Sequence, residues 1–272
     1  MSKAMGFEKI QGIVLKTTPF KERDMIVRLL LRNGQKVSML VYGGQGGGKK
    51  GKPRLLEPGY SLEVVLKKTS VNTDLLTCKE FDVVWAHQSL RHDFQAFSIL
   101  CFYLELMDKS SEEADSSELN SSSFNEGAYR CLANGVFFLD QAIKEKYKRP
   151  MDLLFIFLVK LMFEQGIAPD FSSCSHCQEA LKGLQYIFSV EGEGFVCESC
   201  LNLNTLSFSQ SEFEHGSRLL SHLAQIWALP FQEYMKVDQV DYFEIRQILD
   251  FLSIHLQIDL RSLSTLKLLK VD

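Results

Sequence analysis

Two cysteine pairs with matched spacing constrain this chain more than any other feature. Each pair has the form Cys-x-x-Cys, and 19 residues separate the first pair from the second. Four thiolates at this spacing can bind one zinc ion tetrahedrally, and a gap of about 15 to 20 residues is usual for such sites. Because four protein ligands leave no position for water, the pattern predicts a structural zinc ion. The predicted ligands are Cys174, Cys177, Cys197 and Cys200.

Other interpretations of the cysteines remain open at this point. A lone Cys-x-x-Cys would favour thioredoxin-like redox chemistry, which the second, correctly spaced pair argues against. His176 lies inside the first pair and could replace one sulfur as a ligand. Between the pairs, residues 184–190 and 195–196 are predicted strands of a short hairpin. The other three cysteines, Cys78, Cys101 and Cys131, lie in apolar surroundings and are predicted core residues.

The size and cysteine content indicate where such a chain works. A length of 272 residues is sufficient for two domains with substantial cores. Seven cysteines without a preceding signal peptide fit a reducing cytoplasm better than a secreted disulfide framework. The most apolar run, residues 153–163, contains Lys160 and is about half as long as a membrane-spanning helix. We therefore expect a cytoplasmic protein that does not cross a membrane.

Charge is distributed unevenly along the chain. The first 80 residues contain 15 Lys and Arg against 7 Asp and Glu, a net charge of +8, whereas the remainder contains 15 against 27, a net charge of −12. A basic N-terminal part on an acidic body indicates a polyanionic partner for the N-terminal part.

The first 85 residues have the alternating pattern of short strands. Segments rich in Val, Ile and Leu are separated by Pro, Gly, Asn or charged residues, and Asn33-Gly34 predicts a tight hairpin turn. Five short strands before any helix indicate a small closed sheet of the OB-barrel type. The predicted strands are residues 12–16, 24–31, 36–41, 60–68 and 71–84.

A glycine-rich basic loop, residues 42–54, follows the third predicted strand. It contains four positive charges and no negative one, so we expect it to contact phosphates, although an ordinary surface loop has a similar composition. Its spacing approaches that of a nucleotide-binding P-loop. However, Lys50 stands where that motif needs Ser or Thr, and Pro53 interrupts the helix that should follow.

Helical periodicity begins near Leu90. Apolar stripes that include Phe94 in the first helix and Phe243 in the last are predicted to face the core. A serine-rich and acidic linker, residues 108–126, is predicted to be mobile. We therefore expect an α+β protein: an OB-fold barrel at residues 1–85, then a helical bundle at 86–272, interrupted by the zinc unit at about 171–204. The predicted helices are residues 90–107, 127–146, 150–166, 209–227 and 239–257.

Catalytic motifs are missing from the sequence. It contains neither His-Glu-x-x-His nor Gly-x-Ser-x-Gly, and none of the six histidines is followed two residues later by Glu, as zinc deaminases require. The prediction is a protein that is not an enzyme. An active site assembled from residues distant in sequence, such as that of a zinc hydrolase, remains an alternative.

Several segments resemble the bacterial recombination mediator RecO family. The most specific is Gly-Ile-Ala-Pro-Asp-Phe at residues 166–171, which leads into the first cysteine pair. The resemblance covers nearly the whole chain in the right order. The basic loop departs from the family pattern because a glycine run delays its positive charges. The other matching segments are residues 12–15, 56–58, 103–106 and 260–262, together with Glu22, Asp24 and Gly34.

The resemblance implies an OB-fold joined to a helical domain with a zinc unit. It also implies binding of single- and double-stranded DNA, annealing of complementary strands, assistance in recombinase loading with RecR, and contact with the C-terminal tail of single-strand-binding protein. A non-catalytic scaffold whose basic barrel docks an acidic protein is the alternative. The candidate DNA-binding residues are Arg23, Arg28, Lys49, Lys50, Lys52, Arg54, Lys67 and Lys68.

Overall fold

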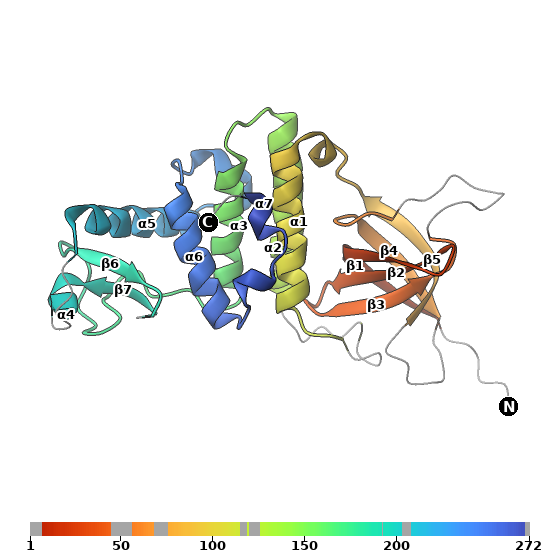
Figure 1. Ribbon diagram of the computed structural model, residues 1–272, viewed down its shortest axis with the longest axis horizontal. Coiled ribbons are helices and arrows are strands. Elements are labelled where there is room, and N and C mark those ends of the chain that lie inside the picture. Colours follow the sequence, from red (N-terminus) through yellow and green to blue (C-terminus); the bar gives the residue numbers. More distant parts are fainter. Residues whose placement is uncertain are drawn as a thin grey trace. The chain divides into compact units, whose positions relative to one another are not determined.

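The computed structural model divides the chain into two compact units, Met1–Lys146 and Tyr147–Asp272. Unit 1 contains a β-barrel and two helices, whereas unit 2 contains the remaining helices and the cysteine hairpin (Figure 1). The predicted division at residue 85 lies inside unit 1, between its barrel and its helices. The residues described are 7–44, 56–67, 76–114, 119, 126–191, 193–202 and 208–269.

The first part of unit 1 is a closed five-stranded barrel, as predicted. Its strands follow the order β1-β2-β3-β5-β4, and all neighbours are antiparallel except β3 and β5. Alternate residues of β2 and β3 point into the barrel, which buries Val27, Leu29 and Met39 completely. The strands are β1 (Phe7–Phe20), β2 (Asp24–Leu31), β3 (Lys36–Val41), β4 (Ser61–Lys67) and β5 (Leu76–Trp85).

The predicted turn between β2 and β3 is present. Gly34 has a φ of 83°, which a residue with a side chain rarely adopts, and the side-chain oxygen of Asn33 accepts a hydrogen bond of 3.1 Å from the backbone N–H of Gln35. This turn fixes the register in which Arg28 lies opposite Ser38.

Two long helices complete unit 1. A 3-10 turn, η1 (Ser89–His92), precedes α1 (Phe94–Ser110), and α2 (Glu126–Lys144) packs against α1. The carboxylate of Asp93 caps α1 by accepting a 2.8 Å bond from the N–H of Ala96. The prediction that Phe94 faces the core is wrong, because its side chain is 74% exposed. It occupies the first position of α1, and the buried face begins with Ala96 instead.

The start of the serine-rich linker packs on the barrel. The N–H of Lys36 donates to the carbonyl of Glu112, and the N–H of Ala114 donates to the carbonyl of Lys36, both at 2.8 Å. Ala114 packs against the barrel core, and Leu119 is part of that core. The described linker residues therefore form a bridge to Lys36 at the start of β3, where the sequence predicts mobile chain. Most of residues 115–125 lie outside the described part of the chain.

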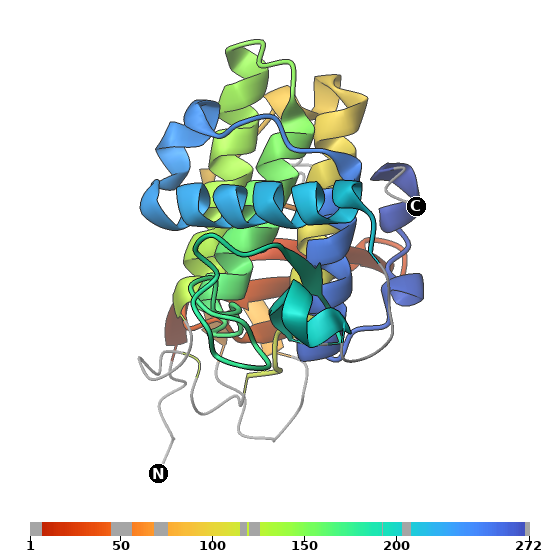
Figure 2. The ribbon, with the colours of Figure 1, turned by 90° about the vertical axis from the view of Figure 1, so that its left-hand side faces the viewer.

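Unit 2 is built on three helices. In Figure 2, α5 (Gln210–Ala228) runs across α3 (Pro150–Glu164) and α6 (Tyr242–His255). The carboxylate of Glu212 accepts a 2.7 Å bond from the backbone N–H of Ser209, as the predicted capping box requires. Three short elements complete the unit: η2 (Phe231–Lys236), η3 (Leu260–Ser262) and α7 (Leu266–Leu269).

The cysteine unit lies between α3 and α5 in the chain. Its hairpin consists of β6 (Tyr186–Ser189) and β7 (Gly194–Cys197), and the short helix α4 (Glu198–Asn202) follows. Strand β6 packs on α5 at Gly216, where a Cβ atom would come within 2.4 Å of the carbonyl oxygen of Tyr186. Only glycine permits this close contact between helix and strand.

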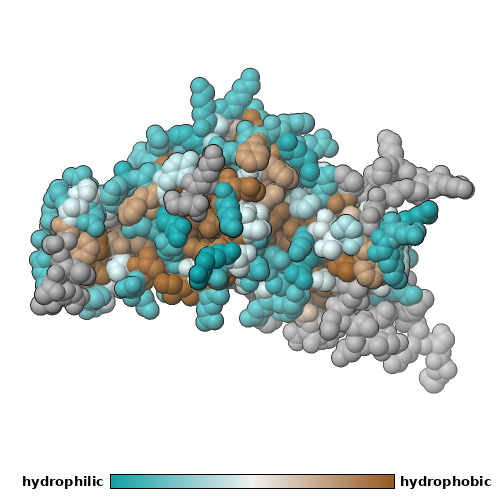
Figure 3. Space-filling view, in the orientation of Figure 1, coloured by the Kyte–Doolittle hydropathy of each residue, from teal (hydrophilic) through white to brown (hydrophobic). Residues whose placement is uncertain are grey.

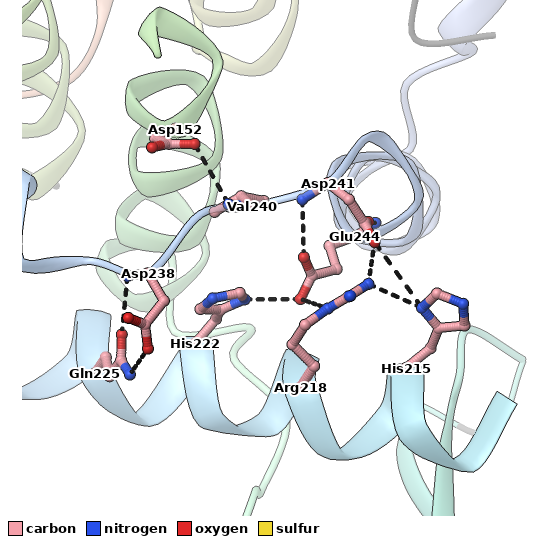
Figure 4. A network of polar contacts seen from close by, with 9 residues as sticks. All are labelled: Asp152, His215, Arg218, His222, Gln225, Asp238, Val240, Asp241 and Glu244. Carbon is pink, nitrogen blue, oxygen red and sulfur yellow. Dashed lines mark hydrogen bonds and ion pairs between the residues drawn. The ribbon is translucent and has the colours of Figure 1, made fainter. Parts of the chain in front are cut away.

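A buried polar network joins α5 to α6 (Figure 4). Nδ1 of His222 lies 2.7 Å from Oε1 of Glu244, and both side chains are buried. Arg218 pairs with Glu244 at 3.4 Å and also with Asp241, which caps α6. The carboxylate of Asp152 in α3 accepts a 3.4 Å hydrogen bond from the backbone N–H of Val240. The network fixes how the three helices meet.

The surface combines hydrophilic residues with hydrophobic patches (Figure 3). The prediction that Phe243 faces the core is wrong: its side chain is 48% exposed, and its ring packs at a tilt against that of His215. Trp227 is also exposed and packs against Phe163, with ring centroids 4.7 Å apart. Within the described residues, no helix combines the length and hydrophobicity that crossing a membrane requires.

Candidate metal centre and nucleic-acid interface

The four predicted ligands converge on one point in unit 2. The sulfur atoms of Cys174, Cys177, Cys197 and Cys200 all lie within 4.8 Å of one another. Sγ of Cys177 is 3.7 Å from Sγ of Cys197. Tetrahedral bonds of about 2.3 Å to zinc place two sulfurs about 3.8 Å apart, so this spacing fits a zinc ion.

Local backbone geometry forms the first pair into a tight turn. The carbonyl of Cys174 accepts a 2.9 Å bond from the N–H of Gln178, whose φ of 62° turns the chain back. The N–H of Cys174 donates to the carbonyl of Glu179 at 2.8 Å. Strand β7 then ends at Cys197, and the first turn of α4 carries Cys200. The β6–β7 hairpin therefore brings two distant pairs together.

The four sulfurs can all carry a negative charge only with a cation between them. Burial raises the pKa of the Cys174 thiol, but backbone N–H groups of Cys177, Cys197 and His176 outweigh it and lower that pKa to about 6. One of these donors, the N–H of Cys197, lies 3.4 Å from Sγ of Cys174. Hydrogen bonding with the neighbouring cysteine sulfurs, Cys177 first, raises the pKa of Cys200 to about 12. Four thiolates at this distance repel one another unless a metal ion neutralises them.

The one histidine and the three other cysteines considered above do not belong to the cluster. His176 is exposed and does not belong to the cluster, so the donor set consists of four sulfurs. Such a set suits zinc and leaves no position for a reacting water. Cys78 and Cys131 are buried away from the cluster and Cys101 is half-buried, as expected of core residues.

Three candidate DNA-binding residues of the barrel can be located. Arg23 is exposed in the turn between β1 and β2, and Lys67 is exposed at the end of β4. Arg28 lies on β2 with a side chain that is 34% exposed. The other five, Lys49, Lys50, Lys52, Arg54 and Lys68, lie outside the described residues.

Arg28 belongs to a charged cluster that sequence reasoning did not identify. Its Nη1 lies 3.0 and 3.3 Å from the two carboxylate oxygens of Asp108, and its Nε donates to Oγ of Ser38 at 3.2 Å. Nζ of Lys36 donates to the carbonyl of Asp108 at 2.5 Å. Glu113 lies 3.9 Å from Arg28 and 4.0 Å from Lys36.

Strand alternation could have revealed part of this cluster. Arg28 lies opposite Ser38, and Lys36 is two residues from Ser38, so both cations share one face of the sheet. Asp108, however, follows Arg28 by 80 residues, and no local pattern links them.

Comparisons with known sequences cover both units. Residues 5–84 match the family described as "Recombination protein O N terminal", and residues 91–264 match "Recombination protein O C terminal". The "DNA repair protein RecO" of Bacillus pumilus (strain SAFR-032) is 27% identical over 244 residues, which is 89% of this chain and 86% of that protein. The protein of the same name from Bacillus subtilis (strain 168) is 26% identical over 71% of this chain and 68% of its own length.

Proposed function

The chain belongs to the RecO family, and from this we propose that it is a non-catalytic mediator of DNA repair and recombination that binds single- and double-stranded DNA and anneals complementary strands. One observation carries the proposal. The N-terminal family of RecO matches the residues of the barrel, and the C-terminal family matches the helical region that follows. The cluster of four cysteines and the positive net charge of the first 80 residues provide further support.

Binding is proposed to be electrostatic. The first 80 residues have a net charge of +8, so this part of the chain attracts phosphates without reading bases. Two strands held by their phosphates repel each other less and can pair. The proposed contacts are Arg23, Arg28, Lys49, Lys50, Lys52, Arg54, Lys67 and Lys68.

The metal centre is proposed to hold one structural zinc ion. Cys174, Cys177, Cys197 and Cys200 would hold it, and the ion would neutralise their charge and fix the hairpin against α5. Because all four ligands are protein sulfurs, the ion would supply folding energy and no hydrolytic chemistry.

The proposed protein partners are RecR and the C-terminal tail of single-strand-binding protein. Together with RecR, the chain would help to load recombinase onto DNA strands that single-strand-binding protein covers. Their support is family membership. The proposed place of action is the cytoplasm.

Strand annealing tests this function. Two complementary oligonucleotides with a donor and an acceptor fluorophore should pair faster with the protein than without it, and more salt should remove the acceleration. A protein that binds an acidic peptide but neither binds nor anneals oligonucleotides would instead support the scaffold alternative.

A further inference from the structure

We propose that the acidic residues Asp108 and Glu113 are a built-in competitor of DNA, which occupies a phosphate-binding site formed by Arg28 and Lys36. This inference rests on the proposed function and adds Lys36 to the DNA contacts. It also assigns a role to the C-terminal turn of α1, which contains Asp108, and to residues 111–114 that follow it: their acidic groups limit the affinity of the barrel face until a nucleic acid displaces them.

The contacts in the cluster imitate those of a phosphate. A guanidinium forms charge-assisted hydrogen bonds with phosphate as it does with carboxylate, and Nη1 of Arg28 donates to both carboxylate oxygens of Asp108, at 3.0 and 3.3 Å. Lys36 donates to the backbone carbonyl of the same residue at 2.5 Å. One acidic residue thus bridges two cations on one face of the sheet, as a phosphate group would.

Asp108 belongs to the C-terminal turn of α1, so only its side chain has to leave Arg28, whereas residues 112–114 are held in a way that permits release. Two backbone hydrogen bonds join Lys36 to Glu112 and Ala114 at the edge of β3. The side chain of Glu113 is 59% exposed, and its ion pairs measure 3.9 and 4.0 Å, so solvent and salt screen them strongly. A polyanion brings several phosphates to the same face and can outcompete these contacts.

Neutralising the competitor tests the proposal. The double variant Asp108→Asn/Glu113→Gln keeps the side-chain shapes but removes both negative charges. We expect its affinity for a single-stranded oligonucleotide at low salt to rise about threefold to tenfold. The plot of log K against log salt should steepen by about 1.4, at about 0.7 for each of two released cations.

A matched control separates this effect from net charge. Glu22→Gln/Glu126→Gln removes two exposed carboxylates of the same unit, and among the described contacts neither carboxylate touches Arg28 or Lys36. Its salt slope should equal that of the unmodified chain. Adding Arg28→Gln and Lys36→Gln to the Asp108/Glu113 variant should abolish the gain.

Hydrogen exchange provides a readout that a purely structural contact would not give. Saturating oligonucleotide should speed exchange at the N–H groups of Lys36 and Ala114, because both hydrogen bonds break when residues 112–114 separate from β3. Unchanged exchange at these two amides, or an Asp108/Glu113 variant that is folded but no steeper in salt than the control, would overturn the proposal. If the unmodified chain itself does not bind DNA, the proposed function fails, and the inference with it.

Discussion

The sulfur atoms of Cys177 and Cys197 lie 3.7 Å apart although 19 residues separate them in the sequence, and no disulfide joins them. Two sulfurs at this distance, outside a covalent bond, have the spacing of ligands on one tetrahedral metal ion. Because the β6–β7 hairpin between them packs on α5, the cysteine cluster connects to the helical framework of unit 2.

Replacing a metal ligand should therefore unfold the hairpin. We expect Cys197→Ser to lose the bound zinc and to lower the melting temperature, since structural zinc can supply on the order of 10 kcal/mol in small peptides. Metal analysis by mass spectrometry and thermal denaturation measure the two effects. Cys101→Ser, which changes a half-buried thiol outside the cluster, should retain one zinc ion per chain. A metal-free Cys197→Ser protein with unchanged stability would contradict the structural role.

Gly216→Ala should destabilise the chain although alanine is the better helix former. The added Cβ would lie 2.4 Å from the carbonyl oxygen of Tyr186, so β6 must move away from α5. We expect a loss of about 1 to 3 kcal/mol in the free energy of unfolding, opposed by a gain of about 1 kcal/mol in helix propensity. Chemical denaturation measures the net change. The neighbouring Ser217→Ala, on the exposed side of α5, should leave stability nearly unchanged.

Removing the Glu244 side chain should lower the free energy of unfolding more than removing the partly exposed carboxylate of Asp250 in the same helix. Glu244→Ala leaves His222 buried without its partner at 2.7 Å and removes the capping contact to Asp241. Breaking a buried pair in this way costs about 3 to 5 kcal/mol. Asp250→Ala, which breaks an exposed pair with Arg246, should cost under about 0.5 kcal/mol. Equal losses for the two variants in urea denaturation would show that the network does not stabilise unit 2.

The basic loop should contribute directly to DNA binding. We expect replacement of Lys49, Lys50, Lys52 and Arg54 by alanine to reduce the single-strand salt slope by about 2 to 3, at about 0.7 per lost contact. Fluorescence anisotropy across a salt series measures the slope. A control removes the same number of positive charges from exposed residues of unit 2: Lys182, Lys236, Arg261 and Lys267. If both variants keep the original slope, the loop is not part of the binding site.

Short-range patterns predicted much of the fold. The predicted strands at residues 24–31 and 36–41 coincide with β2 and β3, because alternation and the Asn33-Gly34 turn are properties of neighbouring residues. The cluster of four cysteines was predictable for the same reason, since each pair is local and the gap between the pairs is that of a short hairpin.

Contacts between distant segments were not predictable in this way. Phe94 and Phe243 both lie in the first turn of a helix, where no neighbouring element of the described chain buries them. An apolar stripe in the sequence does not show how far along the helix the packing of its neighbours extends. The pairing of Arg28 with Asp108 depends on how α1 and its linker return to the barrel, which no local pattern specifies. By contrast, Asp241 and Glu244 form a capping box whose Asp-x-x-Glu pattern was readable in the sequence.

We propose above that the N-terminal part of this chain binds nucleic acid through phosphates. The most direct test of this proposal is the affinity of the unmodified protein for a fluorescent single-stranded oligonucleotide from low to physiological salt. We expect binding at low salt and a linear fall of log K with log salt, with a slope of up to about −6 if all eight proposed cations make contact. Absence of binding at low ionic strength, or an affinity that does not change with salt, would contradict the proposal.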